Sequence, residues 1–281
     1  MGADTGISDL QAVIKANFLC NEYSMDPIKM GATIAAAMEM FELGIIAEKE
    51  TGRPLRFGDA DAMVAMVEAT GKGEGFGKEL ALGSKRLCEK YGHPEFFMGS
   101  KGQEFPAYVG RGAQGTGLNY ATSNSGACHV RGYTIPAEVF GIPDKVDPFA
   151  VEEKAELDKL FHDITAVVDS SGLCLFTTFG IGLSEITALM EGATKAGYND
   201  ENLLKAGERI WNLERLFNQK AGLTGADDTL PKRILEEPIP AGPSKGKTNQ
   251  LSELLPEYYK ARGWDEKGVP TSKKLKELGL A

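Results

Sequence analysis

Residues 169–174 combine the side chains in this sequence that are best suited to chemistry. They read Asp-Ser-Ser-Gly-Leu-Cys and follow a predicted helix, so a carboxylate, a turn glycine at position 172 and a thiol lie close together. Backbone amides near such a turn, with a short acid, can hold a polar heterocycle, and a thiolate can bind iron. The structural alternative makes Cys174 a small buried residue and Asp169 a turn cap. One cysteine alone cannot hold a cluster.

Residues 21–26 form a weaker version of the same pattern. They read Asn-Glu-Tyr-Ser-Met-Asp, again at a predicted helix end, with an amide first and an acid sixth. An ordinary helix cap at Asp26 is the alternative explanation. The presence of both segments favours a functional interpretation more than either segment does alone.

His129 is the best acid–base candidate among only three histidines. It lies in polar, glycine-rich surroundings, where the pKa of an imidazole can be tuned toward neutrality. A hydrogen-bonded loop histidine without a chemical role is the alternative. The other two histidines are predicted to be structural or exposed. His93 precedes a proline, and His162 interrupts a predicted helix.

Composition and charge argue against several classes of protein and of binding partner. The 281 residues carry a net charge of −9, which argues against nucleic-acid partners and anionic membranes. No stretch is apolar enough for a spanning helix, and no signal peptide is evident. The four cysteines are widely spaced, so no zinc or iron–sulfur site is encoded locally, and a reducing, cytoplasmic location is expected.

Hydrophobic periodicity predicts a mostly α protein. Four helices are expected before residue 95, the last of them over 78–91, and further helices after residue 147. Glycine interrupts every periodic pattern over residues 99–132, so this segment is predicted to be a long ordered loop with no helix of ordinary length. We therefore expect two helical domains, residues 1–98 and 99–281.

Four ordered segments resemble the tungsten-containing aldehyde ferredoxin oxidoreductases. Residues 169–174 are similar to the family's D-x-x-G-L-C motif, and residues 21–26 to its D-x-x-G-L-D motif. Residues 106–133 resemble the family's central loop, and residues 258–271 its C-terminal ending. The resemblance covers essentially the whole chain.

The resemblance implies a cofactor and a set of residues that hold it. A family subunit has a mainly β N-terminal domain, which this chain lacks, and two helical domains around a tungsten or molybdenum bis-pyranopterin. The turn that contains Gly172 would place Asp169 and Leu173 on one pterin, while Met25 and Asp26 would contact the other. Cys174 would be the last of four thiolate ligands of a [4Fe–4S] cluster, with the other three upstream of this chain. His129 matches a histidine proposed to bind substrate or move its proton.

The predicted function is therefore the C-terminal part of an enzyme that oxidises small aldehydes to carboxylic acids and passes electrons to ferredoxin. Without an N-terminal region or partner subunit, the isolated chain should be inactive. Two alternatives stay open. One is a benzoyl-CoA-reductase-type subunit of the same family. The other is a non-catalytic helical binding or assembly module, for which Asn21, Ser24, Val109 and Gly110 would be natural departures from the family motifs.

Overall fold

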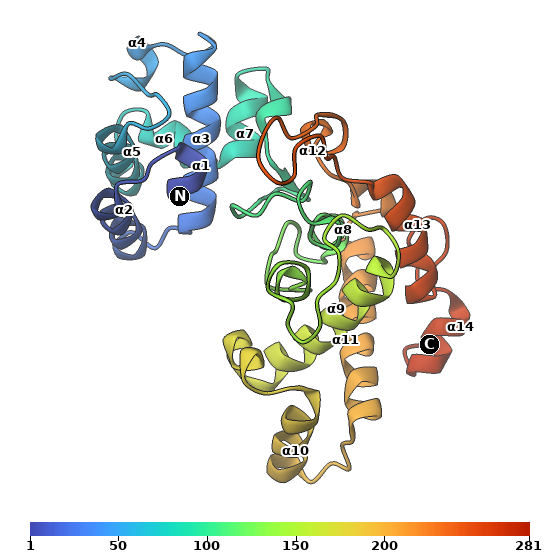
Figure 1. Cartoon of the computed structure of the whole chain (residues 1–281). Coiled ribbons are helices and arrows are strands. Elements are labelled where there is room, and N and C mark those ends of the chain that lie inside the picture. Colours follow the sequence, from blue (N-terminus) through green and yellow to red (C-terminus); the bar gives the residue numbers. More distant parts are fainter. The chain divides into compact units, whose positions relative to one another are not determined.

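The computed structural model describes all residues from 1 to 281 and contains two compact units, Met1–Tyr108 and Val109–Ala281 (Figure 1). Both are built of helices, and the one sheet is an antiparallel pair of two-residue strands, β1 (Gly99–Ser100) and β2 (Gln103–Glu104). The prediction of a mostly α fold is confirmed. No helix combines the length and the apolar character that crossing a membrane requires.

The two units divide after residue 108, later than the predicted division after residue 98. The difference is residues 99–108, which include the β1–β2 hairpin and which glycine content alone places with the second domain. In the structure this hairpin belongs to the first unit, where β2 packs on helix α3 (Pro27–Glu42). Its Glu104 is buried and joins the hairpin to the first unit.

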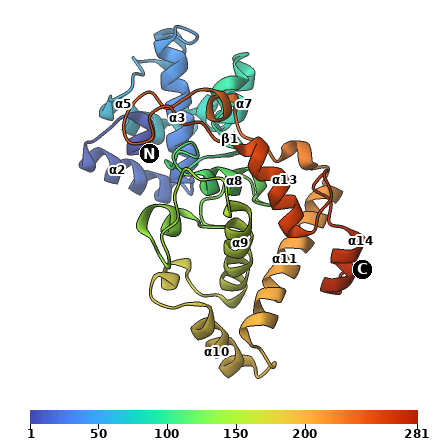
Figure 2. The same cartoon turned by 45° about the vertical axis from the view of Figure 1, so that its right-hand side comes forward.

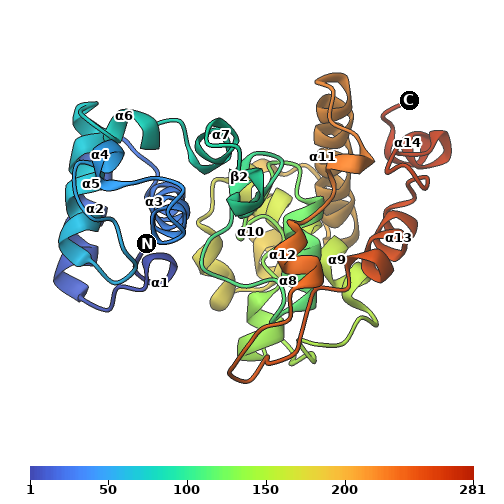
Figure 3. The same ribbon diagram turned by 90° about the horizontal axis from the view of Figure 1, so that it is seen from above.

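The first unit is a helical cluster around α3. Its other elements are α1 (Gly2–Thr5), α2 (Leu10–Glu22), α4 (Glu48–Thr51), α5 (Ala60–Lys72), α6 (Gly77–Leu80), α7 (Ser84–Lys90) and η1 (Pro94–Phe96). Helices α2 and α5 lie side by side (Figure 3). Three helices begin at aspartate caps, namely Asp9, Asp26 and Asp59, whose carboxylates accept backbone N–H bonds. The apolar core includes Met38, Met63 and Leu87.

The helix predicted over residues 78–91 is interrupted, and that expectation is wrong. Helix α6 ends at Leu80, and α7 begins at Ser84 after Gly83, whose φ of 78° favours glycine. Glu104 Oε1 accepts hydrogen bonds from Ser84 N at 3.0 Å and Ser84 Oγ at 2.8 Å. The cap of α7 therefore comes from a residue far along the chain, which local periodicity cannot reveal.

The second unit is centred on two long antiparallel neighbours, α9 (Lys154–Ser171) and α11 (Asp200–Lys220), which lie side by side in both views (Figures 1 and 2). Its other elements are α8 (Gln114–Thr122), η2 (Pro136–Phe140), η3 (Leu175–Phe179), α10 (Leu183–Thr194), η4 (Gly225–Asp227), α12 (Lys232–Glu236), α13 (Leu251–Arg262) and α14 (Ser272–Leu278). Helix α13 packs on α8 and α9.

Helix α8 corrects the prediction that residues 99–132 contain no helix. Every residue of α8 is buried, so no exposed face produces an apolar–polar period. Its glycines serve close packing, since a Cβ on Gly117 would lie 2.0 Å from Asn249 Nδ2. A fully buried glycine-containing helix has the sequence pattern of a loop, so hydrophobic periodicity does not reveal α8.

Glu138 on η2 caps α8 from outside the helix. Its carboxylate accepts hydrogen bonds from Gly115 N at 2.8 Å and Thr116 N at 3.0 Å, and it pairs with Lys154 Nζ at 3.0 Å. Both charged side chains are almost fully buried. The pair thus joins the N-terminal ends of α8 and α9 through charges that are removed from water.

A second buried polar group surrounds Tyr258 of α13. The Tyr258 hydroxyl lies 2.9 Å from His162 Nδ1, 3.1 Å from Trp211 Nε1 and 2.9 Å from Arg262 Nε. The His162 and Trp211 rings are stacked with their centroids 3.9 Å apart. Three helices, α9, α11 and α13, therefore meet at one hydroxyl. His162, predicted to be structural or exposed, is completely buried.

Burial favours the protonated form of Asp158, which lies one turn before His162. Burial raises the pKa of this carboxyl group well above the ordinary value, while the charge of Arg262 acts in the opposite direction. Thr122 Oγ1 lies 2.8 Å from the Leu118 carbonyl and 3.2 Å from Asp158 Oδ2. The Thr122 hydroxyl has one proton, which it can donate to only one of these two oxygens. Both contacts are hydrogen bonds when Asp158 is protonated and donates its carboxyl proton to Thr122 Oγ1.

Replacing Glu138 tests the buried cap. We expect Glu138→Gln to lower the free energy of unfolding by about 3–5 kcal/mol, because it removes the carboxylate that balances the buried charge of Lys154 and leaves the Asp147 carbonyl as the acceptor. Urea denaturation of the whole chain measures this change. The exposed Glu156→Gln on α9 is the matched control, with an expected change within about 0.5 kcal/mol. Equal behaviour of the two variants would contradict the capping role.

Replacing Asp158 tests its protonation. A carboxyl group whose pKa is raised by folding contributes stability below its unfolded pKa, and that contribution is lost as pH rises toward the folded pKa. Asp158→Asn removes this loss, so its stability relative to the parent should increase with pH above about 4, by at most about 1.4 kcal/mol per pH unit.

Urea unfolding of both proteins across pH 4.5 to 8 measures the difference. Groups facing Asp158 are Arg262, Glu138 and His162, and all three are unchanged in the variant. Asp144→Asn, at an exposed position, is the control and should follow the parent. Parallel curves for parent and Asp158→Asn would show that Asp158 is ionised in the folded chain.

Candidate functional site

The two motif segments have the same local geometry, each at a helix end. Ser24 follows α2 with a φ of 56°, and Gly172 follows α9 with a φ of 77°. Both are left-handed residues at the fourth motif position, where a helix stops. Two residues later each motif supplies the cap of the next helix, Asp26 for α3 and Cys174 for η3. Ser24 thus keeps the glycine-like turn despite its side chain.

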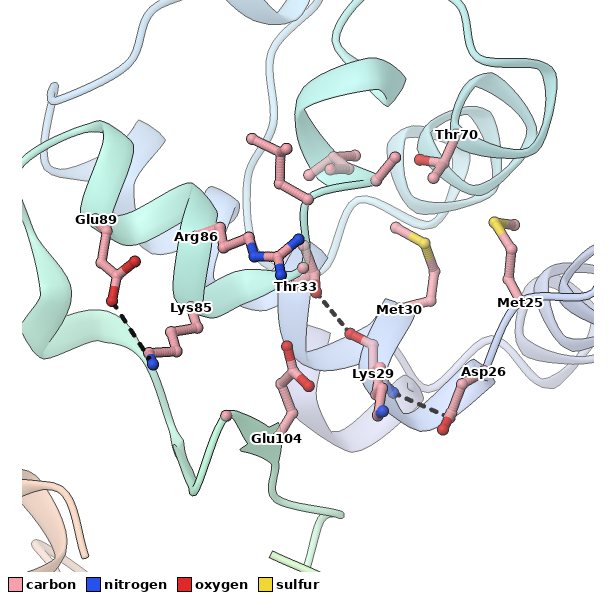
Figure 4. Close-up of a pocket in the computed structure, with 15 residues that line it drawn as sticks. Met25, Asp26, Lys29, Met30, Thr33, Thr70, Lys85, Arg86, Glu89 and Glu104 are labelled. Atoms are coloured by element: carbon pink, nitrogen blue, oxygen red, sulfur yellow. Dashed lines mark hydrogen bonds and ion pairs between the residues drawn. The ribbon is translucent and has the colours of Figure 1, made fainter. Parts of the chain in front are cut away.

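Asp26 and Met25 lie at one side of a 450 Å³ cavity of the first unit (Figure 4). Asp26 Oδ1 accepts hydrogen bonds from Ile28 N at 2.8 Å and Lys29 N at 3.2 Å, which fixes the carboxylate at the start of α3. The side chain is nevertheless exposed, and Met25 is partly exposed. Both residues can therefore contact a ligand while holding the helix end in place.

The opposite side of this cavity carries charged side chains of α7. They are Arg86 and the ion pair of Lys85 with Glu89, whereas Lys29 lies beside Asp26 in the first turn of α3 (Figure 4). Glu104 also lines the cavity, with Oε1 engaged by Ser84. The cavity thus offers cations, the helix-capping carboxylate of Asp26 and the thioether of Met25. This combination suits a polar ligand with an anionic part.

The second motif presents its functional groups on the surface of the second unit. Asp169 is in the last turn of α9 with its side chain 53% exposed, and Cys174 is also exposed. Leu173 between them is half-buried and packs with the small core that contains Val168. A Cβ on Gly172 would meet nothing within 4 Å, so its left-handed φ, not crowding, explains the glycine.

Exposure separates Cys174 from the cysteines of the first unit. Burial raises the pKa of the Cys20 thiol to about 11 and that of Cys88 to about 12. These two thiols stay protonated at neutral pH and are inert packing groups. Cys174 and the half-exposed Cys128 are the thiols that can meet a metal or an oxidant.

His129 is partly exposed in the loop that follows α8. Two residues later, Arg131 Nη2 donates to Glu214 Oε1 at 2.5 Å, and its Nε lies 3.9 Å from Asp169 Oδ2. The guanidinium also lies over the Trp211 ring. Arg131 therefore brings the His129 loop beside the Asp169 turn, two segments that the sequence predicted separately.

The loop is held by hydrogen bonds to side chains of α8 and α9 and to the backbone of α11. Asn119 Nδ2 donates to the Cys128 carbonyl at 2.8 Å, and Gly132 N donates to Thr165 Oγ1 at 3.2 Å. Asn124 Nδ2 donates to the Trp211 carbonyl at 3.1 Å. These contacts give the loop a defined conformation on both sides of His129.

The donor groups of the second motif are few. No group of three or more His, Cys, Asp or Glu side chains in the chain could hold a metal ion. Cys174 is instead a single exposed thiol at a helix end, beside the exposed carboxylate of Asp169. Soft metals held by thiolates need several such donors, so Cys174 can contribute one ligand to a cluster completed from elsewhere.

Sequence reasoning missed the residues that support the loop. Asn119 lies in the segment predicted to be a loop, and nothing in the sequence connects His162 with His129. Neither has a local signal, because their partners are distant in sequence. Arg131 was inside the quoted central loop, but only the structure shows its contacts with Asp169 and Glu214.

Comparison with known proteins gives consistent matches along the chain. The chain is 52% identical over 285 residues to a tungsten-containing aldehyde ferredoxin oxidoreductase of Pyrococcus furiosus, and 50% identical over 286 residues to that of Pyrococcus horikoshii. Each match covers the whole chain and 47% of the relative. The chain thus spans about half the length of these curated relatives.

A solved structure shares the fold. It is the active site complex BamBC of benzoyl coenzyme A reductase in complex with 1,5-dienoyl-CoA, with a TM-score of 0.72 at 19% identity over 93% of this chain and 45% of that one. The family model for aldehyde ferredoxin oxidoreductase, domains 2 and 3, matches residues 1–280. The chain belongs to the aldehyde ferredoxin oxidoreductase family and corresponds to these two domains.

Proposed function

We propose that the chain provides the two helical cofactor-binding domains of an oxidoreductase that converts aldehydes to carboxylic acids. The observation that carries the proposal is the turn at residues 169–174, where an exposed acid, a left-handed glycine and an exposed thiol follow one another beside the His129 loop. The names of the relatives support tungsten as the metal. Four free cysteines suit a reducing, cytoplasmic setting.

A tungsten or molybdenum bis-pyranopterin would supply the two-electron oxidation, and a [4Fe–4S] cluster would pass the electrons singly to ferredoxin. Overall, aldehyde and water give a carboxylic acid, two protons and two electrons. Asp169 and Leu173 would hold one pterin, and Met25 and Asp26 the other. The cations of the first-unit cavity, Lys29 and Arg86 among them, suit an anionic part of the cofactor.

His129 would bind the substrate oxygen or move a proton away from it. Its partial exposure lets the imidazole reach a substrate, while the tethered loop limits the positions it can take. Positioned acid–base groups of this kind typically contribute about 10²–10⁴-fold to a rate. Arg131 would hold the loop and the Asp169 turn in one arrangement.

Two alternatives come from particular observations. The fold shared with BamBC favours a benzoyl-CoA-reductase-type subunit, in which the same motifs would serve another substrate. The altered motif residues Asn21 and Ser24 favour a non-catalytic assembly module. Against the module, Ser24 keeps the left-handed turn and Asp26 keeps its exposed carboxylate.

Removing the Cys174 thiol tests its role as a ligand. In the enzyme assembled with its upstream region, Cys174→Ala should abolish the [4Fe–4S] signal in electron paramagnetic resonance and visible spectra, because three thiolates do not complete the cluster. Cys128→Ala is the matched control and should keep the signal. An unchanged spectrum in Cys174→Ala would remove Cys174 from the ligand set.

Assembly tests the activity. The isolated chain should not reduce a viologen dye with an aldehyde, whereas the chain joined to its N-terminal region or partner should do so and should contain tungsten or molybdenum with pterin. Robust activity of the isolated chain would contradict the claim that it is incomplete. Metal-free assembled protein of ordinary stability would favour the assembly module.

A further inference from the structure

Both sides of His129 rest on the same two buried side chains. On one side, Asn119 Nδ2 donates to the carbonyl of Cys128 at 2.8 Å. On the other, Gly132 approaches so closely that a Cβ would lie 2.1 Å from His162 Cδ2 and 2.4 Å from Asn119 Oδ1. Asn119 and His162 therefore form the surface on which the His129 loop lies.

Hydrogen-bond donors determine the protonation of His162. The Tyr258 hydroxyl is contacted by Trp211 Nε1 and Arg262 Nε, which can only donate. The hydroxyl must then donate its own proton to His162 Nδ1, 2.9 Å away. Nδ1 is an acceptor, so Nε2 carries a proton and donates it to Asn119 Oδ1 at 2.9 Å.

The same bond fixes the orientation of Asn119. Because its Oδ1 accepts from His162 Nε2, its Nδ2 points to the Cys128 carbonyl and donates there. A continuous series of hydrogen bonds thus runs from Tyr258 through His162 and Asn119 to the backbone beside His129. Stacking on Trp211 holds the imidazole plane, and Asp158 Oδ1 lies 3.6 Å from Nε2 with no hydrogen-bond partner of its own.

We propose that His162 is a positioning residue for His129, acting through Asn119 on the Cys128 carbonyl. His162 donates from Nε2, orients the Asn119 amide and thereby holds the loop in one conformation. The inference rests on the proposed role of His129 in catalysis, but the loop contact itself can be measured without cofactor or substrate.

The protonation state is testable in the unaltered chain. Nitrogen-15 labelling of the three histidines should show the His162 ring neutral and protonated at Nε2 at pH 7, and His93→Gln assigns the exposed ring by its disappearance. A His162 ring protonated at Nδ1 alone, or at both nitrogens, would overturn the proposal whatever any variant does.

Two isosteric variants separate positioning from simple stability. In His162→Gln the side-chain amide lies near the position of Nε2 and can still donate to Asn119. In His162→Asn the shorter side chain places its amide near the position of Nδ1, where it can contact Tyr258 but not Asn119. We expect hydrogen exchange at the Gly132 amide to quicken about tenfold or more in His162→Asn and by less than about threefold in His162→Gln. The His129 ring signal should move toward its unfolded value in His162→Asn alone.

Asn119→Asp serves as the second test if His162→Asn does not fold. It keeps an acceptor for His162 but replaces the donor to the Cys128 carbonyl, so it should free the loop in the same way. Loop exchange equal to the parent in a folded His162→Asn or Asn119→Asp would overturn the proposal, as would equal loosening in His162→Asn and His162→Gln.

The assembled enzyme gives the catalytic readout. His162→Asn should lower kcat about tenfold or more with KM within about threefold, and His162→Gln should restore most of the rate, because a displaced catalytic group costs turnover more than binding. If no assembled protein oxidises aldehydes, the proposed function fails, while the ring and exchange measurements still decide whether His162 holds the loop.

Discussion

The hydrogen bonds of the Tyr258 hydroxyl join three helices of the second unit, α9, α11 and α13. The hydroxyl is buried, it receives two donors that cannot accept, and it has one proton to give. Those facts leave His162 Nδ1 as the acceptor, so the ring nitrogen that faces α8, Nε2, carries the proton. Because a buried polar group without a partner is costly, the orientation of each neighbour depends on the one before it. The arrangement beneath the candidate catalytic loop follows from this constraint.

Charged groups impose the same requirement elsewhere in the unit. Arg262 pairs with Asp163 at 2.5 Å, and Glu138 pairs with Lys154, all with little exposure to water. Such pairs are weak evidence for stability, since desolvation offsets much of their attraction. In this unit their role is to position helices. Glu138 fixes the start of α8, which has no local cap and contains two internal glycines.

The candidate site relies on helix ends in both units. At Ser24 and at Gly172 a left-handed residue stops one helix and exposes the next motif positions, and at Asp26 and Cys174 a new helix begins. This places a carboxylate or a thiol on the surface at a fixed point without any cluster of metal ligands in the chain. A cofactor that carries its own sulfur donors needs only such contacts from the protein.

Much of the architecture was determined by sequence alone. The sequence indicates the cap at Asp26 directly, because capping is a local interaction. Residues 169–174 likewise show their acid, turn glycine and thiol without any tertiary information. Tertiary structure alone decided the helix at residues 114–122, the break before Ser84 and the support of His129. In each case the partner is far away in sequence: Glu138 for α8, Glu104 for α7, and His162 with Tyr258 for the loop. Local patterns record local interactions, whereas a buried polar group is satisfied by whichever residue the fold brings to it.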